Sequence, residues 1–292
     1  MTRAKLVAEH DHRVGEGPIW HPDESLLYWV DIPSGRLYTY DPTTDQSRQV
    51  LSLERAVGGF TIQADGSLAL FLESGGVALW DGGGGESALE YLIDAIPGEE
   101  DSRFNDVIAD PEGRVFAGTM PTESESGHLY RIDTDGTYVL ADEEGYDIPN
   151  GMGFTPDGES MYVTESEART IHRFEYDRAT GDISGKETFV EIAAGDGVPD
   201  GLTVDEEGFV WSARWNGHSV VRHAPDGTEV DRIDVPVPKA SSVTFGGDDS
   251  QQLYVTTAKG HDGADPSPAG SLFRAAVDVA GVPEFRSRLA LE

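Results

Sequence analysis

The chain of 292 residues contains no cysteine. Disulfide bonds, thiolate metal ligands and a cysteine nucleophile are therefore excluded. The sequence also has no apolar run near the roughly 18 residues that a membrane-spanning helix needs. Its N-terminus lacks an apolar stretch of signal-peptide length. Together these absences predict a cytoplasmic protein with no membrane partner.

Basic residues are scarce, and lysine is the scarcest of them. Lys and Arg number 21 against 54 Asp and Glu, which gives a formal net charge of −33. Such a surface repels nucleic acid, so we expect no DNA or RNA partner. It suits a protein of a salt-adapted organism, because a Debye length of about 3 Å at 1 M salt screens the self-repulsion. Acidic composition can also indicate disorder, but apolar residues alternate with polar ones from end to end, so we expect a folded chain.

Motifs of several other protein classes are missing too. There is no G-x-S-x-G elbow of a serine esterase and no H-E-x-x-H pair of a zinc protease. The "DTDG" at 133–136 resembles the start of a calcium loop, but it lacks the later glycine and the terminal glutamate, so we interpret it as a hairpin turn. No helix pattern follows the "GGGG" at 82–85, which we interpret as a loop and not as a phosphate cradle.

A strand–turn–strand pattern recurs six times along the chain. Two copies are "FNDVIADPEGRVFAGTM" at 104–120 and "PDGLTVDEEGFVWSARW" at 199–215. Each copy has a short apolar strand, a polar turn and a strand with an aromatic residue, and a further strand follows it. The period of about 43 to 50 residues is that of a four-stranded propeller blade. We therefore predict an all-β fold, a single six-bladed β-propeller domain over 1–292 with no long helix.

A propeller ring must be closed between its first and last blades. The strand predicted at 4–10 belongs to none of the six units. We expect it to join the last blade beside "EFRSRLALE" at 284–292, which would remove the exposed edges there. Nothing in the sequence marks a subunit interface, and we expect a monomer or a weak homo-oligomer.

The turn of each unit locates equivalent positions in the six blades. Gly113 lies eight residues after Asn105, and Gly208 lies eight residues after Asp200. Applied to all units, this spacing selects the positions just before the innermost strands, namely Glu16, Gly58, Asn105, Asn150, Asp200 and Ser242. Because innermost strands surround the central channel, these six positions should form a ring at one mouth of it.

Four of the six ring positions carry oxygen-bearing side chains of the Glu, Asn and Asp types. Any one of them, taken alone, is readily explained as a turn residue. Their recurrence in one ring instead predicts a cation site, because carboxylates brought together without a cation repel one another. Oxygen ligands favour Ca²⁺ or Mg²⁺, and Zn²⁺, Mn²⁺ or Fe²⁺ at an open site also fits.

The same residues carry a family resemblance over nearly the whole chain. The matching motifs are "GEGPIW" (15–20), "RFNDV" (103–107), "GRVFAGTM" (113–120), "IPNGMGFTPDG" (148–158), "VPDGLTVDEEGFVWSARWNG" (198–217) and "LYVTTA" (253–258). The chain resembles the gluconolactonase and regucalcin family, also called the senescence marker protein family. The resemblance implies a six-bladed propeller that holds one divalent cation at the channel mouth and hydrolyses sugar lactones.

Individual residues of the family motifs can be matched to this chain. By resemblance, Glu16, Asn150 and Asp200 correspond to the metal ligands, and Arg103 and Asn105 to a pair that contacts substrate. Glu123, which follows the "AGTM" motif, corresponds to a further acid that contacts substrate, with Glu125 in the same loop as the alternative. Arg103 also has a structural alternative, which is a salt bridge to Asp106 or another acid.

These residues fit a metal-assisted hydrolysis. The metal would act as a Lewis acid on the lactone carbonyl, and Asp200 would orient or deprotonate the attacking water as the catalytic residue. The expected substrate is a small sugar lactone, namely a pentonolactone (xylonolactone or arabinonolactone) or gluconolactone. Two other hypotheses stay open: a lactonase or esterase with a non-sugar substrate, and a non-catalytic calcium-binding propeller.

Overall fold

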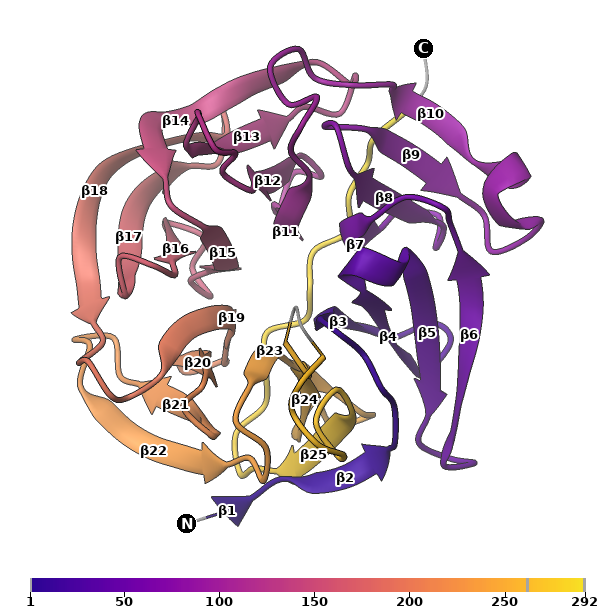
Figure 1. Cartoon of the computed structure of the whole chain (residues 1–292). Helices are drawn as coiled ribbons and strands as arrows, with labels where there is room; N and C mark the ends of the chain where they lie inside the picture. Colours follow the sequence, from indigo (N-terminus) through magenta and orange to yellow (C-terminus); the bar gives the residue numbers. More distant parts are fainter. Residues whose placement is uncertain (1, 261–262, 291–292) are drawn as a thin grey trace.

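The computed structural model describes residues 2–260 and 263–290. Within these ranges the chain forms six sheets arranged in a ring around a central channel (Figure 1). Each sheet is one blade, and in the first five blades the strands follow the chain outward from the channel. The predicted six-bladed propeller is confirmed.

The strands of the six blades have the following bounds. The first three blades contain β3 (Gly15–His21), β4 (Leu26–Asp31), β5 (Arg36–Asp41) and β6 (Gln46–Ser52); β7 (Val57–Ile62), β8 (Leu68–Leu72), β9 (Val77–Trp80) and β10 (Glu90–Ile93); and β11 (Phe104–Ala109), β12 (Val115–Thr119), β13 (Gly127–Ile132) and β14 (Tyr138–Tyr146). The last three contain β15 (Pro149–Phe154), β16 (Ser160–Glu165), β17 (Thr170–Asp177) and β18 (Asp182–Glu191); β19 (Val198–Val204), β20 (Val210–Trp215), β21 (Ser219–His223) and β22 (Glu229–Asp234); and β23 (Ala240–Gly246), β24 (Gln252–Thr257) and β25 (Leu272–Ala276).

Short Asp- and Gly-rich turns connect the two inner strands of a blade. In the third blade the Gly113 N–H donates to the Asp110 carbonyl at 3.1 Å, and Gly113 has a positive φ of 93°. Gly208 makes the corresponding bond to Asp205 in the fifth blade, with φ of 80°. Glycine adopts this left-handed conformation without strain. The turn residues that lie eight positions after the ring residues Asn105 and Asp200 therefore occupy the same structural position in their blades.

Burial falls from the channel outward. Strands β7 and β15 are buried at every residue, whereas β18 at the rim has no buried residue. Apolar clusters among the described residues lie between successive blades, and each of the six blade-to-blade interfaces has one. The cluster between the last blade and the first includes Trp29, Tyr40 and Tyr254. Continuous packing around the ring makes the inner strands a rigid frame for side chains at the channel mouth.

The N-terminus closes the ring. Strand β2 (Lys5–Ala8) pairs antiparallel with β25 and becomes the fourth strand of the last blade, which confirms the predicted closure. Strand β1 (Thr2–Arg3) continues to the neighbouring blade and pairs in parallel with β22 (Figure 1). The N-terminal strands therefore connect the fifth and sixth blades as well as closing the ring.

The predicted position of the C-terminal residues is wrong. We call residues 281–290 the C-terminal segment; it does not pair with β2 but crosses the end of the channel (Figure 1). The Val282 N–H donates to the Val204 carbonyl at 3.1 Å, the Ser287 N–H to Ile62 at 2.9 Å and the Arg288 N–H to Gly113 at 2.8 Å. The edge beside β2 is already taken by β25, so the segment bonds instead to strand ends and turns of several blades. Residues 291 and 292 lie outside the described ranges.

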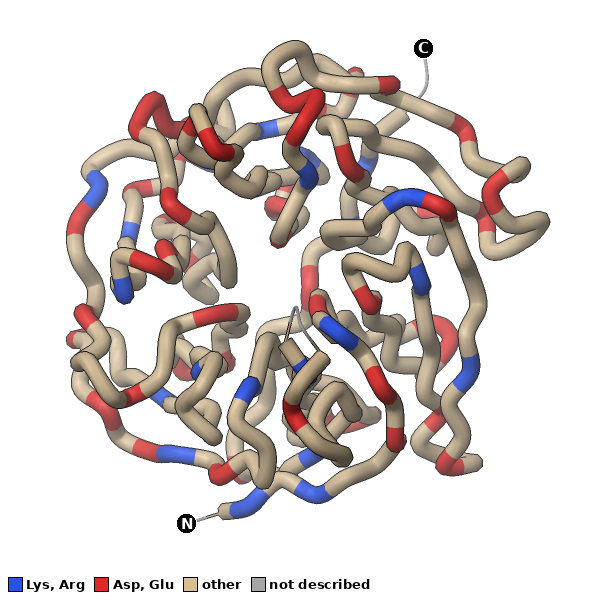
Figure 2. Tube along the Cα trace, viewed as in Figure 1, with Lys and Arg blue, Asp and Glu red and all other residues tan. Residues whose placement is uncertain are grey.

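Helical structure among the described residues consists of two short 3₁₀ turns, η1 (Ile32–Ser34) and η2 (Gly85–Ala88). In that part of the chain we find no helix with the length and apolar character needed to cross a membrane. Asp and Glu residues are distributed over all parts of the ring, and the basic residues are scattered among them (Figure 2).

Candidate active site

The innermost strand of every blade contains a β-bulge near its start. The pairing register shifts between Glu16 and Ile19, Val57 and Gly59, Phe104 and Val107, Asn150 and Met152, Pro199 and Leu202, and Ala240 and Ser242. Each shift inserts one extra residue opposite the second strand, and such insertions bend a strand and redirect a side chain. The six bulges coincide with the six ring positions selected from the sequence spacing.

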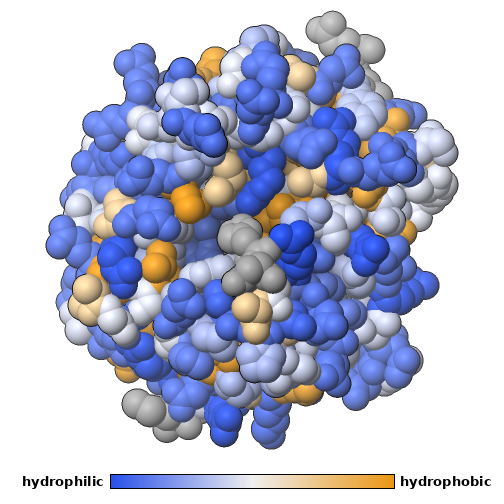
Figure 3. Space-filling model, in the orientation of Figure 1, coloured by the Kyte–Doolittle hydropathy of each residue, from blue (hydrophilic) through white to orange (hydrophobic). Residues whose placement is uncertain are grey.

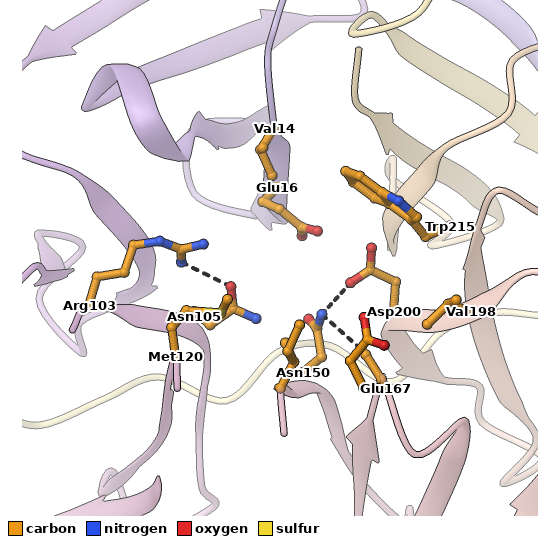
Figure 4. Close-up of a pocket in the computed structure, with 12 residues that line it drawn as sticks. Val14, Glu16, Arg103, Asn105, Met120, Asn150, Glu167, Val198, Asp200 and Trp215 are labelled. Atoms are coloured by element: carbon orange, nitrogen blue, oxygen red, sulfur yellow. Dashed lines mark hydrogen bonds between the residues drawn. The ribbon is translucent and has the colours of Figure 1, made fainter. Parts of the chain in front are cut away.

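A pocket opens at this mouth of the channel. It has a cavity volume of about 200 Å³ and is open to solvent, and a hollow is visible near the centre of the face in Figure 3. Its lining residues are Val14, Glu16, Arg103, Asn105, Met120, Ile148, Asn150, Ser166, Glu167, Val198, Asp200 and Trp215. Five of the six predicted residues, all except Glu123, therefore line one pocket (Figure 4).

The three predicted metal ligands meet in the floor of the pocket. Glu16, Asn150 and Asp200 have exposed fractions of 6%, 7% and 6%. The Asn150 Nδ2 group donates to Asp200 Oδ1 and, at 3.2 Å, to Ser166 Oγ (Figure 4). Glu16 Oε2 accepts a hydrogen bond from the Gly17 N–H at 3.0 Å. These contacts fix the directions of the three side chains before any ligand is bound.

The two acids in the pocket floor are in surroundings that disfavour their negative charges. Burial raises the pKa of the Glu16 carboxyl well above its usual value, and the charges of Asp200 and Asp106 raise it further. Burial likewise raises the pKa of Asp200, again with a contribution from Asp106, while the Asn150 hydrogen bond opposes the shift. Two buried carboxylates at one site are both ionised at low cost only when a cation lies between them.

The donor set fits a hard divalent cation. It combines the carboxylates of Glu16 and Asp200 with the amide of Asn150, whose oxygen and nitrogen exchange places by a half-turn of the amide. Carboxylate and amide oxygens are the ligands that Ca²⁺ and Mg²⁺ prefer. Among the described residues no group of three His, Cys, Asp or Glu side chains could hold a metal, so Asn150 would have to take part.

Arg103 and Asn105 form a second polar unit in the wall of the pocket. The Arg103 guanidinium donates to Asn105 Oδ1 at 2.9 Å and to the Phe104 carbonyl at 2.8 Å, and Asn105 Nδ2 donates to the Pro149 carbonyl at 3.1 Å. Burial lowers the pKa of Arg103 to about 10, and the nearby Glu16 charge opposes this shift. No ion pair is found for Arg103 in the described part of the chain, so the salt bridge to Asp106 is not formed. The guanidinium is therefore held by neutral groups and keeps donors facing the pocket.

The two acids predicted in the neighbouring loop lie elsewhere. Glu123 and Glu125 occupy the connection between β12 and β13, and both side chains are exposed. Neither residue lines the pocket. In this structure the loop folds on itself, with the Glu125 N–H donating to Thr122 Oγ1 at 3.1 Å. A role of either acid in contacting substrate stays a prediction.

Several lining residues were not selected from the sequence. Ser166, Glu167 and Trp215 lie at or just beyond the ends of β16 and β20, the strands that pair with β15 and β19. The second strand of a blade ends where the innermost strand begins, so both reach the same mouth of the channel. Extending the spacing argument from the first strand to the end of the second would have found them.

Comparison with known proteins assigns the family. The model of the SMP-30/Gluconolactonase/LRE-like region matches residues 14–259, and the chain belongs to this family. The matched region contains the whole pocket and every predicted site residue.

Individual relatives are similar over their full length. The chain is 51% identical to pentonolactonase XacC of Haloferax volcanii, with 100% of both chains covered. It is 34% identical to 6-deoxy-6-sulfogluconolactonase of Pseudomonas putida, covering 96% of this chain and 97% of the relative. Among solved structures, a calcium-binding regucalcin from Agrobacterium tumefaciens superposes with a TM-score of 0.89 at 26% identity, covering 99% of this chain and 98% of that one.

Proposed function

We propose that this protein is a metal-dependent lactonase that hydrolyses a sugar lactone to the aldonic acid. The observation that carries the proposal is the pocket itself, in which two buried carboxylates, Glu16 and Asp200, lie beside the donors of Arg103 and Asn105. The full-length similarity to lactonases supports the reaction class. The similarity to a pentonolactonase favours xylonolactone or arabinonolactone over gluconolactone.

Glu16, Asn150 and Asp200 would hold one divalent cation. When bound, the cation would supply positive charge that stabilises the oxyanion developing on the lactone carbonyl. The calcium-binding regucalcin that shares this fold supports a divalent ion, and the ring of oxygen donors is compatible with Ca²⁺, Mg²⁺, Mn²⁺, Zn²⁺ or Fe²⁺. The raised pKa values of Glu16 and Asp200 are the direction expected at a site that favours positive charge.

The chain's own residues would carry out orientation and proton transfer. Arg103 and Asn105 would donate hydrogen bonds to oxygens of the lactone and hold its carbonyl carbon over the pocket floor. Asp200 would accept a proton from the attacking water as the carbon–oxygen bond forms. It would return that proton to the ring oxygen as the ester bond breaks, which yields the open-chain acid.

We further propose that the enzyme works in concentrated salt. The support is the net charge of −33 together with the scarcity of lysine, since self-repulsion of this size is screened only at high ionic strength. Activity assays should therefore be run at molar salt.

The decisive experiment follows acid release by pH-stat in molar salt. Xylonolactone, arabinonolactone and gluconolactone are compared before and after treatment with a chelator, and spontaneous hydrolysis is subtracted. We expect turnover that the chelator abolishes and that one of the divalent ions restores. A folded, metal-loaded protein that hydrolyses none of these lactones would overturn the proposal and leave a binding propeller.

A further inference from the structure

Besides Glu16 and Asp200, one more acid lines the pocket. Glu167 follows Ser166 in the turn between β16 and β17, and its side chain belongs to the pocket wall. In Figure 4 Arg103 lies on one side of Asn150, and Glu167 lies on the other. The pocket therefore has hydrogen-bond donors on one wall and a carboxylate acceptor on another.

The backbone of Glu167 is held firmly. The Ser166 N–H donates to the Ile148 carbonyl at 3.0 Å, and Ser166 Oγ donates to the Pro199 carbonyl at 2.8 Å. The Arg169 N–H closes the turn by donating to the Ser166 carbonyl at 2.9 Å. These bonds fix the backbone position of Glu167 relative to Asn150, which shares the Ser166 hydroxyl as a partner.

The Glu167 carboxylate is free to bind a ligand. No hydrogen bond or ion pair joins it to another residue in the part of the chain that the structure describes. The basic residue of the same turn, Arg169, directs its guanidinium to the carbonyls of Ile192, Ala193 and Gly197 instead. The Glu167 side chain is exposed and lines the pocket, so its carboxylate is accessible to a ligand that enters from solvent.

An unpaired carboxylate in a pocket with both polar and apolar lining residues favours some ligands over others. It accepts hydrogen bonds from hydroxyl groups and repels other anions. The apolar surface beside it, which includes Trp215 and Val198, suits the carbon skeleton of a small neutral ligand. A neutral lactone rich in hydroxyl groups satisfies both requirements, whereas a lactone with an acidic substituent does not.

We propose that Glu167 is a specificity-determining residue that accepts hydrogen bonds from the hydroxyl groups of a neutral sugar lactone and disfavours lactones with an acidic substituent. This inference rests on the proposed lactonase function. Glu167 is an acid in the pocket wall, whereas Glu123, the acid that the family resemblance assigns to substrate contact, does not line the pocket.

The test compares three lactones in the metal-loaded enzyme. Gluconolactone is neutral and hydroxylated, glucaro-1,4-lactone carries a carboxylate, and γ-butyrolactone has no hydroxyl group. For Glu167→Gln we expect kcat/KM to fall roughly 10-fold with gluconolactone, because a charged acceptor is replaced by a neutral one. With γ-butyrolactone we expect no change, and with glucaro-1,4-lactone we expect a rise. Glu159→Gln makes the same charge change in an exposed turn of the same blade and should alter none of the three.

The outcomes separate this inference from the proposed function. If the wild type hydrolyses neutral lactones but Glu167→Gln changes all three substrates by the same factor, the inference is wrong and the lactonase proposal stands. If the wild type hydrolyses no lactone, both fail. A melting temperature of Glu167→Gln equal to that of wild type shows that the substrate-dependent change does not come from misfolding.

Discussion

The two ends of the channel contain the same kind of chemical group in opposite settings. At the open mouth, Glu16 and Asp200 accept hydrogen bonds from Gly17 and Asn150 and face a pocket open to solvent. Deeper in the channel, Asp106 and Glu284 line a smaller cavity of about 30 Å³. Asp106 accepts one hydrogen bond, from the Val107 N–H at 2.8 Å. Glu284 belongs to the C-terminal segment, which covers that end of the channel.

The difference shows that burial of acids does not by itself make an active site. Burial raises the pKa of Asp106 and of Glu284 to about 7, with the Asp106 charge adding to the shift of Glu284. Burial likewise raises the pKa values of Glu16 and Asp200 at the open mouth. Only the open mouth adds an approach for a ligand, a fixed arginine and an amide that directs a carboxylate. We therefore expect substitutions at the open mouth to change catalysis and those at the covered end to change stability.

The largest effect is expected from Asp200→Ala. Removal of a cation ligand that is also the proposed proton acceptor should lower kcat by about 100-fold or more. Lactone hydrolysis in molar salt measures the loss, and circular dichroism checks that the variant is folded. Activity within threefold of wild type would remove Asp200 from the mechanism and weaken the contrast between the two ends.

Gln63→Ala should affect stability but not catalysis. Gln63 anchors the C-terminal segment through two buried hydrogen bonds, from its Nε2 to the Leu289 carbonyl at 2.6 Å and from the Leu289 N–H to its Oε1 at 3.1 Å. Losing both should cost about 2–3 kcal/mol and lower the Tm by roughly 4–10 °C. Calorimetry measures the shift. Gln46→Ala, at an exposed position, serves as the control and should leave the Tm unchanged.

The smallest effect is a pH-dependent gain in stability for Glu284→Gln. The pKa of Glu284 is about 7 in the folded chain against an ordinary value of 4.5, so the folded state holds this proton more tightly than the unfolded state. The free energy of unfolding of wild type should therefore fall between about pH 4 and pH 7 and then level off.

A glutamine cannot bind or release this proton, so the free energy of unfolding of the variant should not show the part of the decline that is due to Glu284. Because Glu284 is partly exposed, solvent screening reduces the effect of this pKa shift on stability. We expect equal Tm values near pH 4 and a Tm higher by roughly 2–4 °C for Glu284→Gln at pH 8, measured by calorimetry. Lactone turnover should stay near wild type. A gain of the same size at both pH values would show that Glu284 does not ionise in this range.

Most of the fold and the centre of the site follow from regular spacing in the sequence. The repeat period predicts six blades, and a constant distance from the turn predicts the ring that contains Glu16, Asn150 and Asp200. The C-terminal segment has no such period, because its position depends on single hydrogen bonds to several blades. Glu167 lies in a turn beyond the second strand, outside the register used for the ring. The loop of Glu123 matches a family motif only up to its first residues, so its path could not be transferred.

The recurring bulge makes the mouth of this propeller modular for protein engineering. In every blade the ring residue lies at a β-bulge of the innermost strand. A residue such as Asn105 or Asn150 can therefore be exchanged without redesigning a strand. The second blade is the exception, since a Cβ atom on Gly58 would lie 1.9 Å from the Phe104 carbonyl oxygen. A designer who wishes to change the metal or the reaction should therefore vary the other blades and leave that glycine in place.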